Sequence, residues 1–263
     1  MSIALIDADS LIYKSGFTFE DKTTWNEIEL ELGTSTVPDT SVTSDLLLAK
    51  NAIDAIIDNI KFKTGCDEVE LWVSGSDNFR YNVMSDYKHN RTVSRKPLEY
   101  DNLYKYLLTK YGAKVAVGYE ADDMVVYLKT THPLQYVLCA IDKDVLYQTE
   151  GNHYNYNKDE FISVSKEEAI RFFWFQVLTG DTTDGYSGCK GIGKVKANRI
   201  LDEVEEESIR LYSGIIDIYG DKVLQVYEEA GLNYDDFIAT CRVANMHQLI
   251  ENNGTFSVNL FEH

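Results

Sequence analysis

Short apolar runs recur through the first half of the chain, and this pattern constrains the fold more than any other feature. The first run, Ser2–Ala8, contains Asp7 near its end, and three more follow at Glu68–Val73, Lys114–Val117 and Tyr136–Ala140. Continuous apolar runs of this length are typical of strands that are buried on both faces of a parallel sheet. We therefore predict a central, mostly parallel sheet.

Helical patterns lie between these runs. Thr43–Phe62, Leu98–Tyr111 and Asp122–Lys129 carry apolar residues at helical spacing. Strands that alternate with helices predict an α/β fold, in which helices flank the sheet. From Lys166 to about Ile250 the pattern is helical, apart from a glycine-rich stretch, so we place a boundary near Phe175. The predicted domains are residues 1–175 and 176–263.

Acidic residues cluster where the predicted elements begin or end. Because ligands bind beyond the carboxyl ends of parallel strands, we expect these acids to converge. Crowded carboxylates repel one another unless a cation is present, and oxygen ligands select hard ions such as Mg²⁺ or Mn²⁺. Two such ions, roughly 4 Å apart, can hydrolyse a phosphodiester. The clusters are Asp7 with Asp9, Glu120 with Asp122 and Asp123, Asp142 with Asp144, and Asp181 with Asp184.

Any single acidic pair is more commonly solvated than catalytic in a chain with 43 acids. We interpret Asp9 in that way, as a surface acid. Asp123 either belongs to the metal-binding set or supplies a favourable charge at the start of a helix. The remaining clusters recur in a consistent order at strand ends and helix starts, which favours a metal site.

The formal net charge of −18 argues against a polyanionic partner, but the basic residues are concentrated in two windows. One window contains Lys190, Lys194, Lys196 and Arg199 and no acid. The other, Arg80–Lys96, contains five basic residues and one acid. This division of charge favours nucleic-acid binding at these windows.

The first window also contains Gly191 and Gly193 ahead of a basic helix. Glycines permit close approach of backbone amides to a phosphate, and a helix N-terminus adds a favourable dipole. Such a site could bind the phosphate backbone of a DNA duplex without recognising its base sequence. The alternative is an ordinary turn between two helices.

In the second window, aromatic and basic side chains are interleaved from Phe79 to Arg91. Such segments stack single-stranded bases and contact phosphates. A solvated surface helix is the alternative. The four cysteines stand far apart, without zinc spacing, and are interpreted as reduced and mostly packed in the core.

Together these motifs resemble the structure-specific 5′ nucleases, which include flap endonucleases and the 5′ nuclease domain of bacterial DNA polymerase I, with phage 5′→3′ exonucleases nearest. The matching segments occur in the order of the family and cover most of Ile3–Ala197. They are LIDADSLIY from Leu5, FRYNVMSDYKHNR from Phe79, GYEADDMV from Gly118, AIDKDVLYQ from Ala140 and TGDTTDGYSGCKGIGKVKA from Thr179.

The resemblance implies a PIN-like sheet, a helical arch near residues 79–97, and a C-terminal helix–three-turn–helix region that binds duplex DNA, with K⁺ at its turn. It implies that Lys88 and Arg91 contact the scissile phosphate and that Tyr87 stacks on a terminal base. One metal would be held by Asp7, Glu120 and Asp122, and the other by Asp142, Asp144, Asp181 and Asp184. The remaining DNA contacts would come from Arg80, Lys190, Gly191, Gly193, Lys194, Lys196 and Arg199.

The chain departs from the family pattern after its second strand, where the family usually has an aspartate. Ser74 or Gly75 occupies this position, and Asp77 is slightly displaced. We expect either weaker binding of the first metal or an Asp77 that reaches it through water. Activity should then survive with a higher metal requirement.

Two alternatives remain. IDADSLI approximates the DxDx[TV] motif of haloacid-dehalogenase-type phosphatases, in which Asp7 would be the nucleophile and Asp9 the acid/base. The other is a DNA-junction-binding protein that does not cut.

The substrate expected is DNA with a free 5′ end, a flap or a junction between duplex and single strand, and the motifs leave an RNA primer open. No run of about 18 apolar residues or signal peptide is evident, so we expect a cytoplasmic monomer that does not contact membranes, in the host if the chain is phage-encoded.

Overall fold

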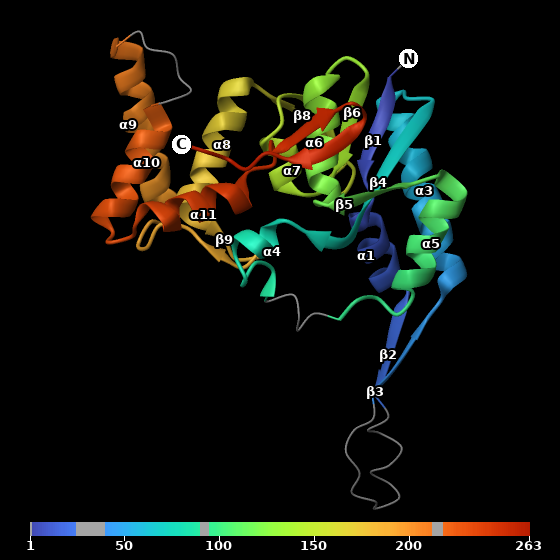
Figure 1. Cartoon of the computed structure of the whole chain (residues 1–263). Helices are drawn as coiled ribbons and strands as arrows, with labels where there is room; N and C mark the ends of the chain where they lie inside the picture. Colours follow the sequence, from blue (N-terminus) through green and yellow to red (C-terminus); the bar gives the residue numbers. More distant parts are fainter. Residues whose placement is uncertain (1, 25–39, 90–94, 212–217) are drawn as a thin grey trace, which may run out of the picture.

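A six-stranded sheet forms the centre of the molecule, in the order β5-β4-β1-β6-β7-β8 (Figure 1). The structure is a computed structural model that describes residues 2–24, 40–89, 95–211 and 218–263. The strands are β1 (Ile3–Asp7), β4 (Glu68–Asn78), β5 (Lys114–Gly118), β6 (Tyr136–Ala140), β7 (Gly151–Asn155) and β8 (Glu160–Val164).

The four predicted strands are confirmed as a parallel block. β1 pairs in parallel with β4 and β6, and β4 pairs in parallel with β5. Ala4, Leu5 and Ile6 are fully buried, as expected for a strand covered on both faces. Two further strands were not predicted: β7 continues the parallel order, and β8 returns antiparallel to it.

Helices cover both faces of the sheet. The helices α1 (Asp9–Thr18), α3 (Leu46–Thr64) and α5 (Tyr100–Tyr111) share one apolar core with β1 and β4, and α6 (Ala121–Thr131) and α7 (Lys143–Tyr147) share another. The predicted helices are therefore confirmed, and α/β is the fold class. All four cysteines are buried free thiols.

The C-terminal helices pack into a third core. These are α8 (Lys166–Thr179), α9 (Lys194–Leu211), α10 (Ile218–Glu229) and α11 (Tyr234–Ala244). The predicted boundary near Phe175 lies inside α8, whose Trp174, Val177 and Leu178 all belong to this core. The packing therefore favours a boundary before Lys166.

The C-terminal domain predicted over residues 176–263 ends in strands, close to the point near Ile250 where the predicted helical pattern stops. Leu249–Asn252 (β11) and Thr255–Val258 (β12) form an antiparallel hairpin. Leu249 packs in the core of α6, and the ring of Phe256 lies 5.5 Å from that of Tyr127. The chain thus returns to the first domain, where Leu249 is the one residue of β11 that is buried.

Two further segments complete the described chain. β2 (Glu20–Thr24) and β3 (Thr40–Ser44) pair antiparallel and project from the body beside α1 and α5 (Figure 1). These two strands flank residues 25–39, which lie outside the described residues. In the described part of the chain, no helix has both the length and the apolar composition of a membrane crossing.

Candidate functional site

Five carboxylates from three strand ends line one groove of about 990 Å³. Asp7 is the last residue of β1, and Asp142 follows β6 as the N-cap of α7. Glu120 and Asp122 begin α6, after β5. Asp9, in the first turn of α1, is the fifth. The parallel strands therefore bring together acids that are far apart in sequence, at the edge where ligands of such sheets bind.

The carboxylates of the groove repel one another. Burial raises the pKa of Asp7 well above its usual range, and the charges of Asp9 and Asp142 raise it further. Burial likewise raises the pKa of Asp122, and Asp7 and Asp142 add to the shift. A cation in the groove would relieve this repulsion, since it favours the ionised forms.

A second acidic group lies next to the groove without lining it. Lys143 pairs with Asp144 at 3.0 Å and also with Asp181. Burial and the charge of Asp142 raise the pKa of Asp144 to about 6. Burial would raise the pKa of Asp181, but the hydrogen bond from Lys143 lowers it. A lysine ammonium thus already serves as the cation for these two acids.

Lys88 enters the groove from the other side. Its ammonium contacts Glu120 and lies 3.9 Å from Asp184, and its backbone N–H donates to the carbonyl of Asp184 at 2.7 Å. Burial alone would raise the pKa of Glu120, but the charges of Lys88 and Arg80 lower it to about 2. Glu120 is therefore ionised and held by Lys88. Arg91, the other predicted phosphate contact, lies outside the described residues.

The donor chemistry of the groove fits Mg²⁺ or Mn²⁺, because every acidic ligand offers oxygen. As they stand, however, no three Asp, Glu, His or Cys side chains among the described residues are arranged to hold a metal ion. Glu120 is paired with Lys88, and Asp144 and Asp181 are paired with Lys143. These three acids would have to turn away from the lysines before they could bind an ion.

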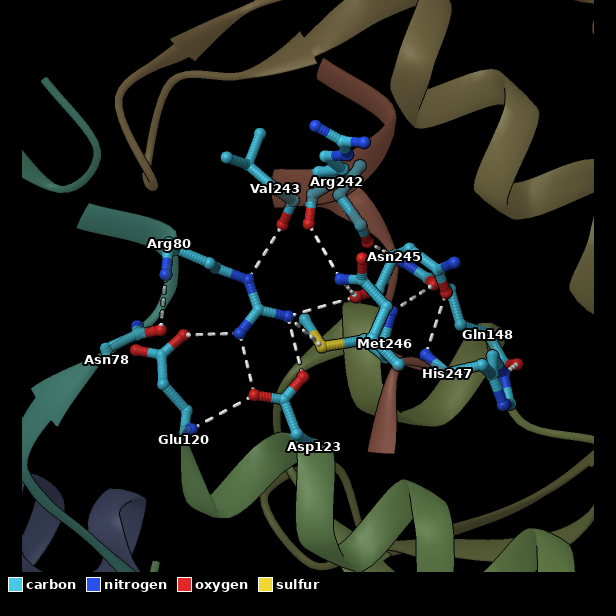
Figure 2. Close-up of polar contacts among 12 residues, drawn as sticks. Asn78, Arg80, Glu120, Asp123, Gln148, Arg242, Val243, Asn245, Met246 and His247 are labelled. Carbon is cyan, nitrogen blue, oxygen red and sulfur yellow. Dashed lines mark hydrogen bonds and ion pairs between the residues drawn. The ribbon is translucent and has the colours of Figure 1, made fainter. Parts of the chain in front are cut away.

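The side chain of Arg80 is 0% exposed, so in this conformation it does not present the surface that the predicted DNA contact needs. Figure 2 shows its guanidinium between α6 and the chain that follows α11. Both Nη atoms donate to Asp123 at 2.7 Å, and Nε donates to the carbonyl of Val243 at 2.9 Å. Asp123 is also 0% exposed. Its carboxylate is occupied by Arg80 and by the backbone N–H of Glu120, so its prediction as a metal ligand is corrected as well.

Tyr87 is also buried, at 1% exposure, which rules out the predicted stacking on a terminal base in this conformation. Its hydroxyl donates to Glu120 at 2.9 Å and to Asp184 at 3.1 Å. Tyr87 therefore bridges Glu120 and Asp184 instead of facing a nucleotide.

Aromatic side chains also line the groove. Tyr81 belongs to the predicted stacking segment, whereas the exposed Tyr13 and Phe17 of α1 were missed from the sequence. The ring of Tyr13 lies 5.6 Å from that of the half-buried Tyr100. The four-residue spacing from Asp9 to Tyr13 and on to Phe17 could have indicated them, because it places all three on one face of α1.

The interpretation of Asp9 as a solvated acid is wrong. Its carboxylate lines the groove and accepts hydrogen bonds from the backbone N–H of Ser74. Asp77 does not line this groove; it is exposed at an adjoining cleft that β4, β5 and the start of α5 border.

The glycine-rich segment leads from α8 into α9 through a short hairpin, β9 (Gly180–Asp181) and β10 (Tyr186–Ser187). Gly191 has a φ of 79°, a conformation that glycine adopts without strain. The predicted cations around it are all exposed. They are Lys190, Lys194, Lys196 and Arg199.

No family profile matches the sequence. A curated relative, the 5′-3′ exonuclease of Bacillus subtilis (strain 168), is 27% identical over 154 residues, a match that covers 51% of this chain and 51% of the relative. The match thus spans about half the length of that protein.

Solved structures share the fold over nearly the whole chain. A bacteriophage T5 flap endonuclease variant in a pseudo-enzyme–product complex with DNA and metal ions has a TM-score of 0.59 at 16% identity, covering 93% of this chain and 92% of that one. T5 5′-exonuclease with bound zinc ions gives 0.58 at 16% identity, with the same coverage. The catalytic core of Rad2 with a DNA substrate gives 0.51 at 13% identity, covering 92% and 78%. The sequence match and the shared fold confirm that this chain resembles the structure-specific 5′ nuclease family.

Proposed function

We propose that this protein is a metal-dependent 5′→3′ exonuclease and flap endonuclease that hydrolyses phosphodiester bonds of DNA. The observation that carries the proposal is the groove at the carboxyl edge of the sheet, where five carboxylates and Lys88 face one space. Buried and half-buried acids at this density call for a cation, and the lysine offers a contact for a phosphate. The activity of the B. subtilis relative and the DNA and metal ions in the T5 complex support the same function.

Two divalent ions, Mg²⁺ or Mn²⁺, are proposed cofactors. Asp7, Glu120 and Asp122 would hold one ion, and Asp142 with the second acidic group would hold the other, partly through water. That second group is Asp144, Asp181 and Asp184. Ions bound at these carboxylates would lower the pKa of an attacking water and stabilise the departing oxygen.

The side chains of the groove would orient the substrate. The Lys88 ammonium lies beside Glu120 and could transfer its contact to the scissile phosphate, because the carboxylate would then be free for an ion. Arg91 remains a proposed second contact. Tyr13 and Tyr81 expose ring surface in the groove and take over the stacking role first assigned to Tyr87.

The duplex part of the substrate would bind at α9. The exposed Lys190, Lys194, Lys196 and Arg199 would contact phosphates, and the backbone at Gly191 and Gly193 would approach the duplex closely. We propose that this segment is a helix–three-turn–helix element with K⁺ at its turn. The proposed setting is phage DNA replication or degradation in the host cytoplasm, with the protein a monomer and an RNA primer a further candidate substrate.

The decisive experiment is cleavage of a DNA flap duplex that carries separate 5′ and 3′ labels, with Mg²⁺ or Mn²⁺ and with EDTA. Short 5′ products or one released flap, both abolished by EDTA, are expected. Asp142→Asn should abolish cleavage while keeping DNA affinity. An intact flap at every metal concentration, together with tight DNA binding, would favour the non-catalytic junction-binding alternative. Release of phosphate from an aryl phosphate would favour the phosphatase.

A further inference from the structure

The end of β4 lacks the acid that the proposed first metal site would take from it. Ser74 occupies the position, and its hydroxyl accepts a hydrogen bond from the backbone N–H of Ala121 at 2.9 Å. Gly75 could not carry an acid without movement, because a Cβ there would lie 2.5 Å from the carbonyl oxygen of Ala116. Asp77 is exposed and borders the other cleft. No residue of β4 itself therefore supplies the carboxylate.

The Asp9 carboxylate lies at this place instead. Its two oxygens are 3.1 and 3.2 Å from the backbone nitrogen of Ser74, although Asp9 belongs to the first turn of α1. It lines the groove with Asp7, Glu120 and Asp122. It is also close enough to Asp7 and Glu120 for their charges to interact with its own.

A simple helix-start role does not explain this arrangement. Acids in a first turn are favourable for the helix dipole, and such a role would leave the carboxylate near the amides of α1. The Asp9 carboxylate instead accepts hydrogen bonds from the backbone N–H of Ser74 in β4. The N-cap residue of α1 is Ala8, and no side chain caps the start of the helix. The orientation of Asp9 thus matches a groove ligand better than a cap.

We infer that Asp9 replaces the missing carboxylate of β4 as a ligand of the first metal ion, alongside Asp7, Glu120 and Asp122. This inference rests on the proposed function, since it concerns the same site. It also replaces the expectation that Asp77 reaches the metal through water. The number of acids around the first ion is then preserved, although one of them comes from a helix instead of a strand.

The test measures Mn²⁺ binding to the folded protein by calorimetry and by electron paramagnetic resonance, without DNA. Asp9→Asn should weaken Mn²⁺ binding at the first site by about tenfold or more, because ligand charge sets the affinity for hard ions. Asp77→Asn is the matched control and should bind as the parent does. Asp9→Asn with Ser74→Asp should recover most of the affinity, because it returns the carboxylate to β4. The recovery also shows that Asp9→Asn did not act by unfolding the chain.

Flap cleavage in Mg²⁺, measured on the same proteins, separates this inference from the proposed function. A parent that cleaves DNA, with Asp9→Asn binding Mn²⁺ unchanged, overturns the role of Asp9 and leaves the function standing. Weaker binding in Asp77→Asn than in Asp9→Asn also overturns it. A parent that neither binds Mn²⁺ nor cleaves DNA overturns both.

Discussion

The structure allows an estimate of how much stability the protein would lose if the buried ion pair between Arg80 and Asp123 were broken. Both side chains are fully buried, and both Nη atoms lie 2.7 Å from the carboxylate. Arg80→Met keeps much of the length of the side chain but removes its charge, so Asp123 stays buried without a counter-charge. Removal of one partner from a buried pair costs about 3 to 5 kcal/mol. The free energy of unfolding of a typical protein is about 5 to 15 kcal/mol, so this loss would be a large fraction of it.

Urea unfolding followed by circular dichroism measures this cost. Arg80→Met should lower the unfolding midpoint strongly, and the exposed Arg199→Met is the control that should not. Arg80→Met combined with Asp123→Leu should be more stable than Arg80→Met alone, because it removes the uncompensated charge. If Arg80→Met unfolds within about 0.5 kcal/mol of the parent, or if the double variant loses the sum of both single effects, the reasoning is refuted.

Two further predictions concern titratable groups. Burial lowers the pKa of His153 to about 4, so the folded state resists protonation of this imidazole. The neutral imidazole does not destabilise the fold above about pH 6.5. As the pH falls towards 4, the free energy of unfolding should decrease by up to about 3 kcal/mol. In urea midpoints measured from pH 7 to 4, His153→Gln should remove this part of the acid destabilisation. Substitution of the exposed His132 is the control and should leave the pH profile as it is in the parent. Equal pH profiles for the parent and His153→Gln would contradict the prediction. Asp122→Asn should raise the melting temperature without metal at pH 7, because it removes a buried charge repelled by Asp7 and Asp142, and it should lose the further rise that Mn²⁺ gives the parent; a lower melting temperature than the parent in EDTA would count against it.

The parallel strands, and the convergence of acids at their carboxyl ends, could be predicted from the sequence. An apolar run of strand length is a direct sign of a strand that is buried on both faces. β7 was missed since Gly151–Asn155 carries polar residues, of which His153 and Asn155 are buried. The orientation of Arg80 could not be predicted either. Arginine is usually exposed, and its partner Asp123 lies 43 positions away. A basic segment rich in aromatic residues does not indicate which of its side chains turn inward.

The acids around the groove fall into two groups by the cations that the chain itself provides. Glu120 is held by Lys88, and Asp144 and Asp181 are held by Lys143. Asp7 and Asp122 instead have raised pKa values from burial and mutual repulsion. A cation binds most favourably where carboxylates still repel one another without a counter-charge. We therefore expect an ion from solution to bind first at the Asp7 and Asp122 side of the groove. At the first position only Glu120 must leave a lysine, whereas at the second both Asp144 and Asp181 must leave Lys143, so the two proposed metal positions differ in the work that filling them requires.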